Sequence, residues 1–194
     1  IVIERLLGLE FEISMESFFQ TNPSSAERLY TKALDYVFEE RLSEGDVVMD
    51  LFCGTGTIGQ LLTQRQKGVK IIGVDIVPEA IEDAKRNAER NRINNVTFYA
   101  ADVGKFLLQY PEYTGKINTI ILDPPRAGIA PKTLRKVIAL GADHIVYISC
   151  NPSTQARDMQ TLKEGGYEVE KLSLVDQFPH TGHIESIAKF KRSE

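Results

Sequence analysis

The sequence of 194 residues is poor in cysteine, histidine and tryptophan, and it has no long apolar run. Its two cysteines, Cys53 and Cys150, give neither a disulfide framework nor a metal-ligand spacing, which is typical of a reducing compartment. No segment approaches the roughly 20 apolar residues that cross a bilayer, and no basic leader precedes an apolar stretch. We therefore expect a cytoplasmic protein without a membrane partner.

An excess of positive charge is also missing. The chain has 23 Lys and Arg against 27 Asp and Glu, a formal net charge of −4. A protein that coats DNA or RNA without specificity needs a basic surface, because phosphate neutralisation supplies most of that affinity. We therefore expect no DNA partner, and any RNA contact must be local. Candidates for such contacts, which exposed helix faces explain equally well, are Arg126, Lys132, Arg135, Lys136 and Arg157.

Short β-branched runs alternate with helix-like stretches, which predicts a parallel sheet built from βαβ units. The predicted parallel strands cover residues 47–52, 70–75, 96–100, 117–122 and 144–149. Two further runs, 167–175 and 184–190, have a connection too short for a parallel crossover and are predicted to pair antiparallel. The pattern predicts an α/β, Rossmann-like class I methyltransferase fold: a mostly parallel seven-stranded sheet with a C-terminal antiparallel hairpin and helices on both faces.

The segment ahead of this sheet contains a predicted helix. Asn22 followed by Pro23 is a typical helix start, and apolar residues continue at helical spacing to Phe38. Residues 1–13 are predicted to form two short strands. We expect residues 1–17 to be the remnant of a preceding subdomain, residues 18–194 to form one catalytic domain, and the chain to be part of a longer protein.

A glycine-rich segment follows the first strand of the sheet and opens a helix. Gly54, Gly56 and Gly59 have the spacing of a dinucleotide fingerprint, and Asp75 stands near the position of its ribose-binding acid. Asp50 ends the strand and would repel a pyrophosphate, which binds helix N–H groups away from anions. The same carboxylate would attract S-adenosylmethionine, which carries an ammonium and a sulfonium. We favour this cofactor and keep a nicotinamide-dependent oxidoreductase as the alternative.

Two aspartates end later strands and are candidates for contact with the cofactor. Asp75 can accept hydrogen bonds from both ribose hydroxyls, and Asp102 follows the third strand within reach of an adenine edge. The alternative is that both carboxylates cap the helices that follow them, as aspartate commonly does. We expect ligand contact at both positions.

The next two strands end in motifs that indicate chemistry. Asp-Pro-Pro-Arg at residues 123–126 places a carboxylate and a rigid turn at the edge where open α/β sheets bind substrates. Amino-group methyltransferases have a similar Asp-Pro-Pro turn, but an aromatic residue that stacks on the target base follows it. Arg126 occupies that position here, which disfavours an amino-group methyltransferase. Cys150 precedes a helix start at Pro152, so we expect the helix N-terminus to lower its thiol pKa. A cysteine after an apolar strand is commonly a buried small hydrophobe, but its place at the ligand edge favours a nucleophile.

The last motif, residues 176–185, is a polar turn before the final strand. It ends in Glu185, which is a candidate base. Its histidines, His180 and His183, have no third ligand at a suitable spacing, so we expect no metal site.

Together these motifs resemble those of the RNA uracil-5-methyltransferases, which act on uridines of tRNA or ribosomal RNA. The likeness covers residues 18–185 and rests on five motifs in the family's order: Phe18-x-Gln20-x-Asn22, the loop at 50–56, the turn at 123–126, Ser149-Cys150-Asn151-Pro152 and the motif at 176–185. It implies Cys150 as nucleophile and Glu185 as proton acceptor. It also implies a pocket for S-adenosylmethionine formed by Gln20, Phe52, Gly54, Thr57, Asp75, Asp102 and Asp123.

The implied reaction is methyl transfer from S-adenosylmethionine to carbon 5 of a uridine, through a cysteine adduct at carbon 6. Many members carry glutamate at the position of Asp75 and asparagine at that of Thr57, and both residues present here keep an oxygen acceptor. Members often carry an RNA-binding barrel, and some an iron–sulfur domain, ahead of this region. We therefore expect an RNA-binding domain in the full-length protein. A cytosine-5 methyltransferase and a non-catalytic RNA-binding fragment are the remaining alternatives.

Overall fold

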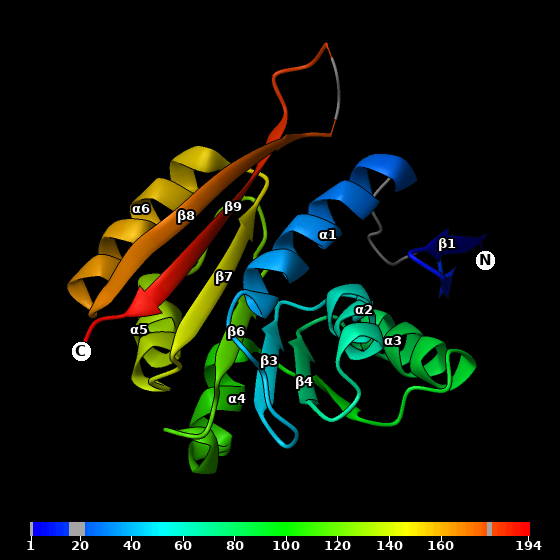
Figure 1. Cartoon of the computed structure of the whole chain (residues 1–194), viewed down its shortest axis with the longest axis horizontal. Helices are drawn as coiled ribbons and strands as arrows, with labels where there is room; N and C mark the ends of the chain where they lie inside the picture. Colours follow the sequence, from blue (N-terminus) through cyan, green and yellow to red (C-terminus); the bar gives the residue numbers. More distant parts are fainter. Residues whose placement is uncertain (1, 16–21, 178–179) are drawn as a thin grey trace.

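A seven-stranded β-sheet forms the centre of the molecule and carries helices on both faces (Figure 1). The computed structural model describes residues 2–15, 22–177 and 180–194 of the chain. The strands of the sheet are β3 (Val47–Leu51), β4 (Lys70–Asp75), β5 (Val96–Ala100), β6 (Thr119–Leu122), β7 (His144–Ser149), β8 (Tyr167–Asp176) and β9 (Ile184–Arg192). The helices are α1 (Pro23–Phe38), α2 (Thr57–Arg65), α3 (Pro78–Arg90), α4 (Val103–Gln109), α5 (Pro131–Ala139) and α6 (Pro152–Glu164), with a 3₁₀ turn at Pro111–Tyr113.

The strands lie in the order β5-β4-β3-β6-β7-β9-β8, and β3 to β7 are parallel to one another. β9 runs antiparallel to both β7 and β8. This arrangement confirms the predicted fold, including the C-terminal hairpin. Four boundaries differ. β6 begins at Thr119 rather than at residue 117, and β3 ends before Phe52, whose φ of 62° turns the chain out of the sheet. β8 ends at residue 176 rather than 175, and β9 at residue 192 rather than 190. No helix in the described ranges is both long and apolar enough to cross a membrane.

Strand residues alternate between two hydrophobic cores, one on each face of the sheet. Val48 and Ile71 belong to the core that α1 and α2 cover, whereas Met49 and Ile72 belong to the core under α4, α5 and α6. All four side chains are buried. Because helices cover both faces, the central strands β6 and β7 are buried along their whole length, whereas the edge strand β8 alternates between apolar and polar residues.

The direction in which the sheet grows reverses between β3 and β6. From β3 the chain proceeds outward through β4 to β5, and then returns to add β6 and β7 on the other side of β3. At such a reversal the loops after the strands diverge and leave a crevice at the carboxyl edge of the sheet, where ligands bind. The loop after β3 holds the glycine-rich segment and the loop after β6 holds the Asp-Pro-Pro-Arg turn. The topology therefore brings the two predicted site regions together.

An antiparallel hairpin precedes the sheet, as the sequence predicts. Its strands are β1 (Val2–Leu6) and β2 (Leu9–Ile13). Phe11 of this hairpin is fully buried in the core shared with α1 and α2. The side chain of Asn87 on α3 also holds β2, because its Oδ1 accepts from the Glu12 N–H at 2.7 Å. The hairpin thus packs on the face of the sheet that α1 covers. The origin of residues 1–17 in a preceding subdomain stays a prediction.

Candidate active site

A cavity of about 630 Å³ lies at the carboxyl edge of the sheet. This volume is within the range of small-molecule sites. All predicted site residues that the structure describes line the cavity: Phe52, Gly54, Thr57, Asp75, Asp102, Asp123, Cys150 and Glu185. Gln20 and Phe18 lie outside the described residues, as do Phe178 and Pro179 of the closing motif. The loops after all five parallel strands, together with the start of β9, therefore contribute to one site.

The loop between β3 and α2 brings its backbone to the cavity through left-handed conformations. Phe52 has a φ of 62° and Gly54 a φ of 53°. The Gly54 N–H donates to Asp75 Oδ2 at 2.8 Å, which ties the loop to the end of β4. Gly56 also has a positive φ, and a Cβ there would lie 2.4 Å from the Phe98 ring. Glycine is thus needed at residue 56 both for the backbone conformation and for the close approach.

The carboxylates of Asp75 and Asp102 hold backbone groups and line the cavity at the same time. Asp75 accepts from the N–H groups of Gly54 and, through Oδ1, of Val77 at 3.0 Å. Asp102 Oδ1 accepts from the Lys105 N–H at 2.9 Å and so caps α4. The two readings considered from the sequence, helix-end capping and ligand contact, are therefore compatible in space. Each carboxylate keeps further lone pairs for a ligand donor.

Asp50 does not line the cavity, contrary to the argument made for it from the sequence. Its side chain is 1% exposed and lies beneath the glycine loop, where Oδ2 accepts from the Gly59 N–H at 3.2 Å. Its other oxygen has no hydrogen-bond partner within the described part of the chain. Burial raises the pKa of Asp50 to about 7, and the nearby Asp75 contributes to the rise. The carboxylates that can contact a bound cation are instead Asp75, Asp102, Asp123 and Glu185.

The raised pKa of Asp50 predicts a stability that falls with rising pH. Since the folded-state pKa of about 7 exceeds the ordinary 3.8, the contribution of Asp50 is fully present below pH 3.8 and is lost as pH rises through 7. Asp50→Asn keeps an acceptor for the Gly59 N–H but cannot ionise. Between pH 5 and pH 8 its free energy of unfolding should therefore fall less than that of the wild type, by on the order of a few kcal/mol. Urea denaturation at pH 5 and pH 8 measures this. Glu168→Gln, at an exposed position of β8, is the control; equal slopes in wild type and Asp50→Asn would contradict the prediction.

Asp123, Glu185 and Tyr30 also line the cavity, and Tyr30 and Glu185 are buried. Burial raises the pKa of Asp123 well above its usual range, and the charges of Glu185, Asp50 and Asp75 raise it further. Burial also raises the pKa of Glu185, which is 9% exposed. The pKa of Tyr30 is raised by burial and by the Asp123 and Glu185 carboxylates. A cationic ligand in the cavity would relieve this accumulation of acidic groups.

Cys150 and Glu185 reach the cavity from neighbouring antiparallel strands. Ser149 at the end of β7 is paired with Ser186 near the start of β9. Cys150 follows Ser149 in the chain and Glu185 precedes Ser186, so the sheet itself brings thiol and carboxyl to the same edge. Both side chains line the cavity. Hydrogen bonds also fix the backbone on either side of the thiol, since the Asn151 N–H donates to Ser149 Oγ at 3.0 Å and this hydroxyl donates to Asn151 O at 2.9 Å.

The thiol of Cys150 has a raised pKa, whereas the sequence led us to expect a lowered one. α6 does begin just after Cys150, with Asn151 as its N-cap. Burial raises the pKa of the thiol, and the acidic side chains of Glu185 and Asp123 raise it further. A backbone hydrogen bond and the Arg126 guanidinium act in the opposite direction. Arg126 is the one basic side chain among the described residues that line the cavity.

Several cavity residues were not singled out from the sequence. Tyr30 lies on α1, within the segment whose helical spacing of apolar residues continues to Phe38, and this spacing does not distinguish a core side chain from a ligand contact. Ile76 and Val77 follow β4 and are 64% and 39% exposed, although both are large and apolar. Exposed apolar side chains at a cavity rim are typical of a surface that a ligand covers. Their position in the sequence, directly after the predicted ribose-binding Asp75, could have identified Ile76 and Val77 as cavity residues.

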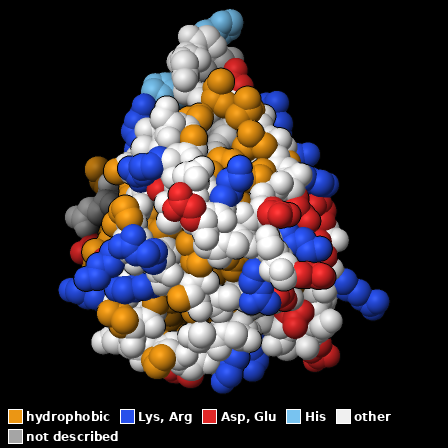
Figure 2. All heavy atoms as spheres, turned by 90° about the vertical axis from the view of Figure 1, so that its left-hand side faces the viewer, with side chains coloured by type: hydrophobic (Ala, Val, Ile, Leu, Met, Phe, Trp, Pro, Cys, Tyr) orange, Lys and Arg blue, Asp and Glu red, His pale blue; other side chains and the backbone are white. Residues whose placement is uncertain are grey.

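The basic residues considered as RNA contacts differ in their surroundings. Figure 2 shows the side of the molecule that carries α6, where basic side chains predominate on the left half and acidic ones gather on the right. Lys132 and Arg135 on α5 are exposed, as is Arg126. Lys136 Nζ donates to the Gly104 carbonyl at 3.3 Å, and Arg157 pairs with Asp158. A local RNA contact by this group stays a prediction.

A second cluster of ionisable groups lies away from the cavity, where α1 meets β7, β8 and β9. Glu40, His144 and Glu170 offer ligand atoms within 4.8 Å of one another. The buried Lys189 ammonium lies 3.4 Å from the carboxylates of both Glu40 and Glu170 and 3.0 Å from that of Glu39. Its charge balances the acidic groups, so the cluster is explained as an ion-pair network.

Comparison with known proteins assigns the chain to a family. The family model described as tRNA (Uracil-5-)-methyltransferase matches residues 7–193. A protein of Clostridium acetobutylicum named an uncharacterized RNA methyltransferase is 47% identical over 195 residues, covering 98% of this chain and 40% of the relative. A protein of Clostridium tetani with the same name is 44% identical over 193 residues, covering 100% of this chain and 41% of the relative. The chain thus spans about two fifths of the length of these curated relatives.

Solved structures give the same result at the level of the fold. The tRNA (uracil-54, C5)-methyltransferase of Pyrococcus abyssi, in complex with S-adenosyl-L-homocysteine, matches with a TM-score of 0.80 and 35% identity, over 97% of this chain and 43% of that one. Precorrin-6y C5,15-methyltransferase from Geobacter metallireducens matches with a TM-score of 0.73 at 14% identity, over 94% of this chain and 95% of that one, a likeness of fold alone. The resemblance noted in the sequence is confirmed: the chain belongs to the tRNA (uracil-5-)-methyltransferase family.

Proposed function

We propose that this chain is the catalytic domain of an RNA methyltransferase that transfers a methyl group from S-adenosylmethionine to carbon 5 of a uridine, with Cys150 as nucleophile. The observation that carries the proposal is that Cys150 and Glu185 line the same cavity as the glycine loop and its surrounding carboxylates. A nucleophile, a base and a cofactor site within one cavity are what this chemistry requires.

The cavity suits S-adenosylmethionine better than a nicotinamide dinucleotide. Asp75, Asp102 and Asp123 line it, and such carboxylates would repel a pyrophosphate but attract an ammonium and a sulfonium. Asp75 is suited to hold the ribose hydroxyls, and the exposed side chains of Ile76 and Val77 to cover the adenine. The backbone at Gly54, together with Phe52 and Thr57, would contact the remainder of the cofactor. When bound, the cofactor supplies an electrophilic methyl group.

Cys150 and Glu185 divide the chemistry on the uracil ring between them. Carbon 5 of uracil is a poor nucleophile, so the Cys150 thiolate adds first to carbon 6 and makes carbon 5 electron-rich. A new carbon–sulfur bond then holds the base while carbon 5 gains its methyl group. Glu185 takes the proton that carbon 5 still carries. The electrons of the carbon–hydrogen bond then form the double bond between carbons 5 and 6, and the carbon–sulfur bond breaks to return the Cys150 thiolate. The raised pKa of Glu185 makes its carboxylate a better proton acceptor than an exposed glutamate.

The target uridine must leave its stack to reach Cys150, at a cost of a few kcal/mol, which favours a loop nucleotide in tRNA or ribosomal RNA. With a formal net charge of −4, the chain offers little general affinity for RNA. We therefore expect an RNA-binding domain in the full-length protein to supply part of it. We also expect the reaction to take place in the cytoplasm, where the Cys150 thiol is kept reduced.

The proposed function predicts 5-methyluridine as the product. The full-length protein is incubated with S-adenosylmethionine that carries an isotope-labelled methyl group and with unmodified tRNA or ribosomal RNA, and the digested nucleosides are analysed by mass spectrometry. Label in 5-methyluridine is expected. Label in 5-methylcytidine would support a cytosine-5 enzyme instead, and binding of nicotinamide dinucleotide without binding of S-adenosylmethionine would overturn the cofactor assignment.

A further inference from the structure

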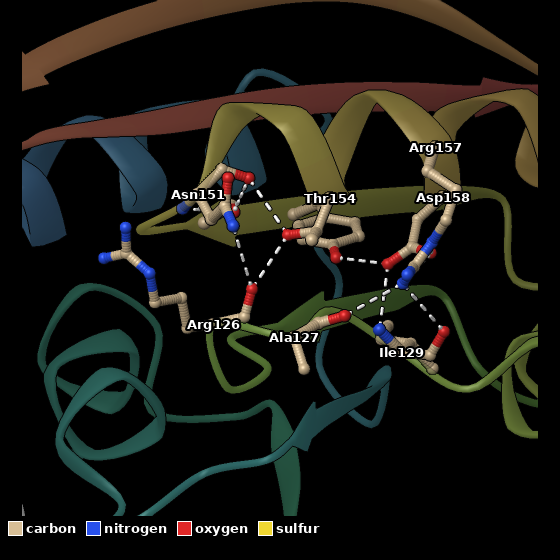
Figure 3. Close-up of polar contacts among 9 residues, drawn as sticks. Arg126, Ala127, Ile129, Asn151, Thr154, Arg157 and Asp158 are labelled. Carbon is tan, nitrogen blue, oxygen red and sulfur yellow. Dashed lines mark hydrogen bonds and ion pairs between the residues drawn. The ribbon is translucent and has the colours of Figure 1, made fainter.

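The turn that carries the Asp-Pro-Pro-Arg motif is fastened to α6 through its backbone (Figure 3). Within this turn, at residues 124–129, the Arg126 carbonyl accepts from Thr154 Oγ1 at 3.0 Å and from Asn151 Nδ2 at 3.3 Å. The Ala127 carbonyl accepts from Arg157 Nη2 at 3.0 Å. All three donors lie on or next to the first turns of α6. We call this set of contacts, together with those of Asp158 below, the α6 latch.

Asp158 is the buried centre of the α6 latch. The side chain is 2% exposed and points from α6 between the turn and β7. Its Oδ2 accepts from the Ile129 N–H at 2.9 Å and from the Tyr147 hydroxyl at 2.6 Å. Its Oδ1 accepts from Arg157 Nη2 at 3.0 Å. One carboxylate thus joins β7, α6 and the end of the turn. If Asp158 were replaced by a neutral residue, each of its partners would lose a charged hydrogen-bond acceptor.

The turn and α6 also approach each other closely at Gly128. Gly128 has a φ of 78°, and a Cβ at this position would lie 2.6 Å from Arg157 Nη2, 2.8 Å from Asp158 Oδ2 and 3.2 Å from the Thr154 side chain. Gly128 has no side chain of its own, so these three α6 side chains pack directly against the backbone of the turn. Because the contact is direct, a shift of the turn relative to α6 requires the latch to break.

The latch connects the two chemical parts of the cavity. The turn begins beside Asp123 and carries Arg126, which both line the cavity, whereas α6 begins immediately after Cys150. Since β6 and β7 fix only the strand ends, the latch determines where Arg126 stands relative to the thiol. Around the thiol, Glu185 and Asp123 supply acidic groups and Arg126 the cation that opposes them.

We infer that Asp158 is a positioning residue for methyl transfer, which through the α6 latch holds the Arg126 turn in place beside Cys150. This role rests on the proposed function, because it concerns Cys150 as the nucleophile. Asp158 does not line the cavity itself. Its substitution should therefore change the reactivity of the thiol and the rate of turnover while leaving the cofactor site intact.

The first test needs neither RNA nor cofactor. Alkylation of Cys150 by iodoacetamide is followed by mass spectrometry of its own peptide across a pH series, in wild-type full-length protein and in Asp158→Asn. The variant keeps the shape of the side chain but removes the charge that pairs with Arg157. Release of the turn withdraws Arg126 from the thiol, so the midpoint of the alkylation profile should move up by about half a pH unit or more.

The second test separates turnover from binding. For Asp158→Asn, kcat for methyl transfer should fall by about 10- to 100-fold, because small displacements of reacting groups cost this much. The KM for S-adenosylmethionine should change little. Leu162→Val is the matched control: Leu162 is fully buried on α6 and belongs to the core instead of the latch. It should lower the Tm while keeping kcat and the alkylation midpoint.

Thr154→Val serves as a second variant if Asp158→Asn does not fold. It removes the hydroxyl that donates to the Arg126 carbonyl, and it should raise the midpoint of the Cys150 alkylation profile by a smaller amount than Asp158→Asn does. An unchanged alkylation midpoint and kcat in the folded variant would overturn the positioning role, as would an equal loss in Leu162→Val. Failure of the proposed function is recognised separately, because wild-type protein would then neither methylate RNA nor form a covalent adduct, whatever the alkylation profiles.

Discussion

Cys150→Ala is expected to reduce methyl transfer to RNA by on the order of 10⁴-fold or more, the size of effect found when a covalent nucleophile is removed. Without the thiolate, carbon 5 of the uracil gains no electron density and cannot accept a methyl group. Cofactor affinity should change little, because the described side chains assigned to S-adenosylmethionine come from the loops after β3, β4, β5 and β6 and not from the loop after β7 that carries Cys150. A loss of turnover with retained cofactor binding is therefore the specific result.

The same variant can be tested for adduct formation with RNA that contains 5-fluorouridine. Fluorine at carbon 5 cannot be removed as a proton, so a competent nucleophile remains attached to carbon 6 and the complex survives a denaturing gel. Wild-type protein should give this complex and Cys150→Ala should not. Cys53→Ala is the control for the other cysteine, which lines the same cavity, and it should still form the adduct. An adduct in Cys150→Ala, or turnover at the wild-type rate, would rule out the covalent mechanism at this residue.

The fold could be predicted from the sequence because its signals are local and repeated. The parallel strands are short, mainly apolar runs between turn residues, and burial on both faces explains why the runs of the central strands contain few polar residues. The reversal between β3 and β6 then follows from the number and order of the strands, and it determines which loops face one another. Asp75, Asp102, Asp123 and Cys150 could be identified as site candidates because each stands at the end of a parallel strand.

The remaining features depend on three-dimensional neighbours that no spacing reveals. Asp50 is the second-last residue of β3, yet the backbone of the glycine loop covers its side chain, so its carboxyl group is buried instead of facing a ligand. The pKa of the Cys150 thiol is raised by burial and by the carboxyl groups of Glu185 on β9 and of Asp123 after β6, none of which the spacing around the cysteine reveals. Asp158 had no signal at all, because its partners Tyr147 and Ile129 lie on other elements of the chain.

Glu185→Gln should separate methylation from release of the product. Glutamine keeps the size of the side chain at the start of β9, so Cys150 can still add to carbon 6 and carbon 5 can still be methylated. An amide cannot accept the carbon 5 proton, and without its removal the sulfur is not expelled. Because the buried carboxyl of Glu185 has a raised pKa, wild-type protein should also release product more slowly as pH falls and the base becomes protonated. The variant and low pH should therefore impair the same step.

The expected result for Glu185→Gln is a protein–RNA complex that accumulates with time and survives a denaturing gel, formed with unmodified RNA and S-adenosylmethionine. Its RNA should carry the transferred methyl group, which isotope-labelled cofactor reveals. Glu168→Gln, an exposed position on the neighbouring strand, should turn over normally without such a complex. In Cys150→Ala/Glu185→Gln the complex should disappear, because its bond is to the Cys150 sulfur. Normal turnover of Glu185→Gln without a complex would assign proton removal to another group, of which Asp123 is the next carboxyl in the cavity.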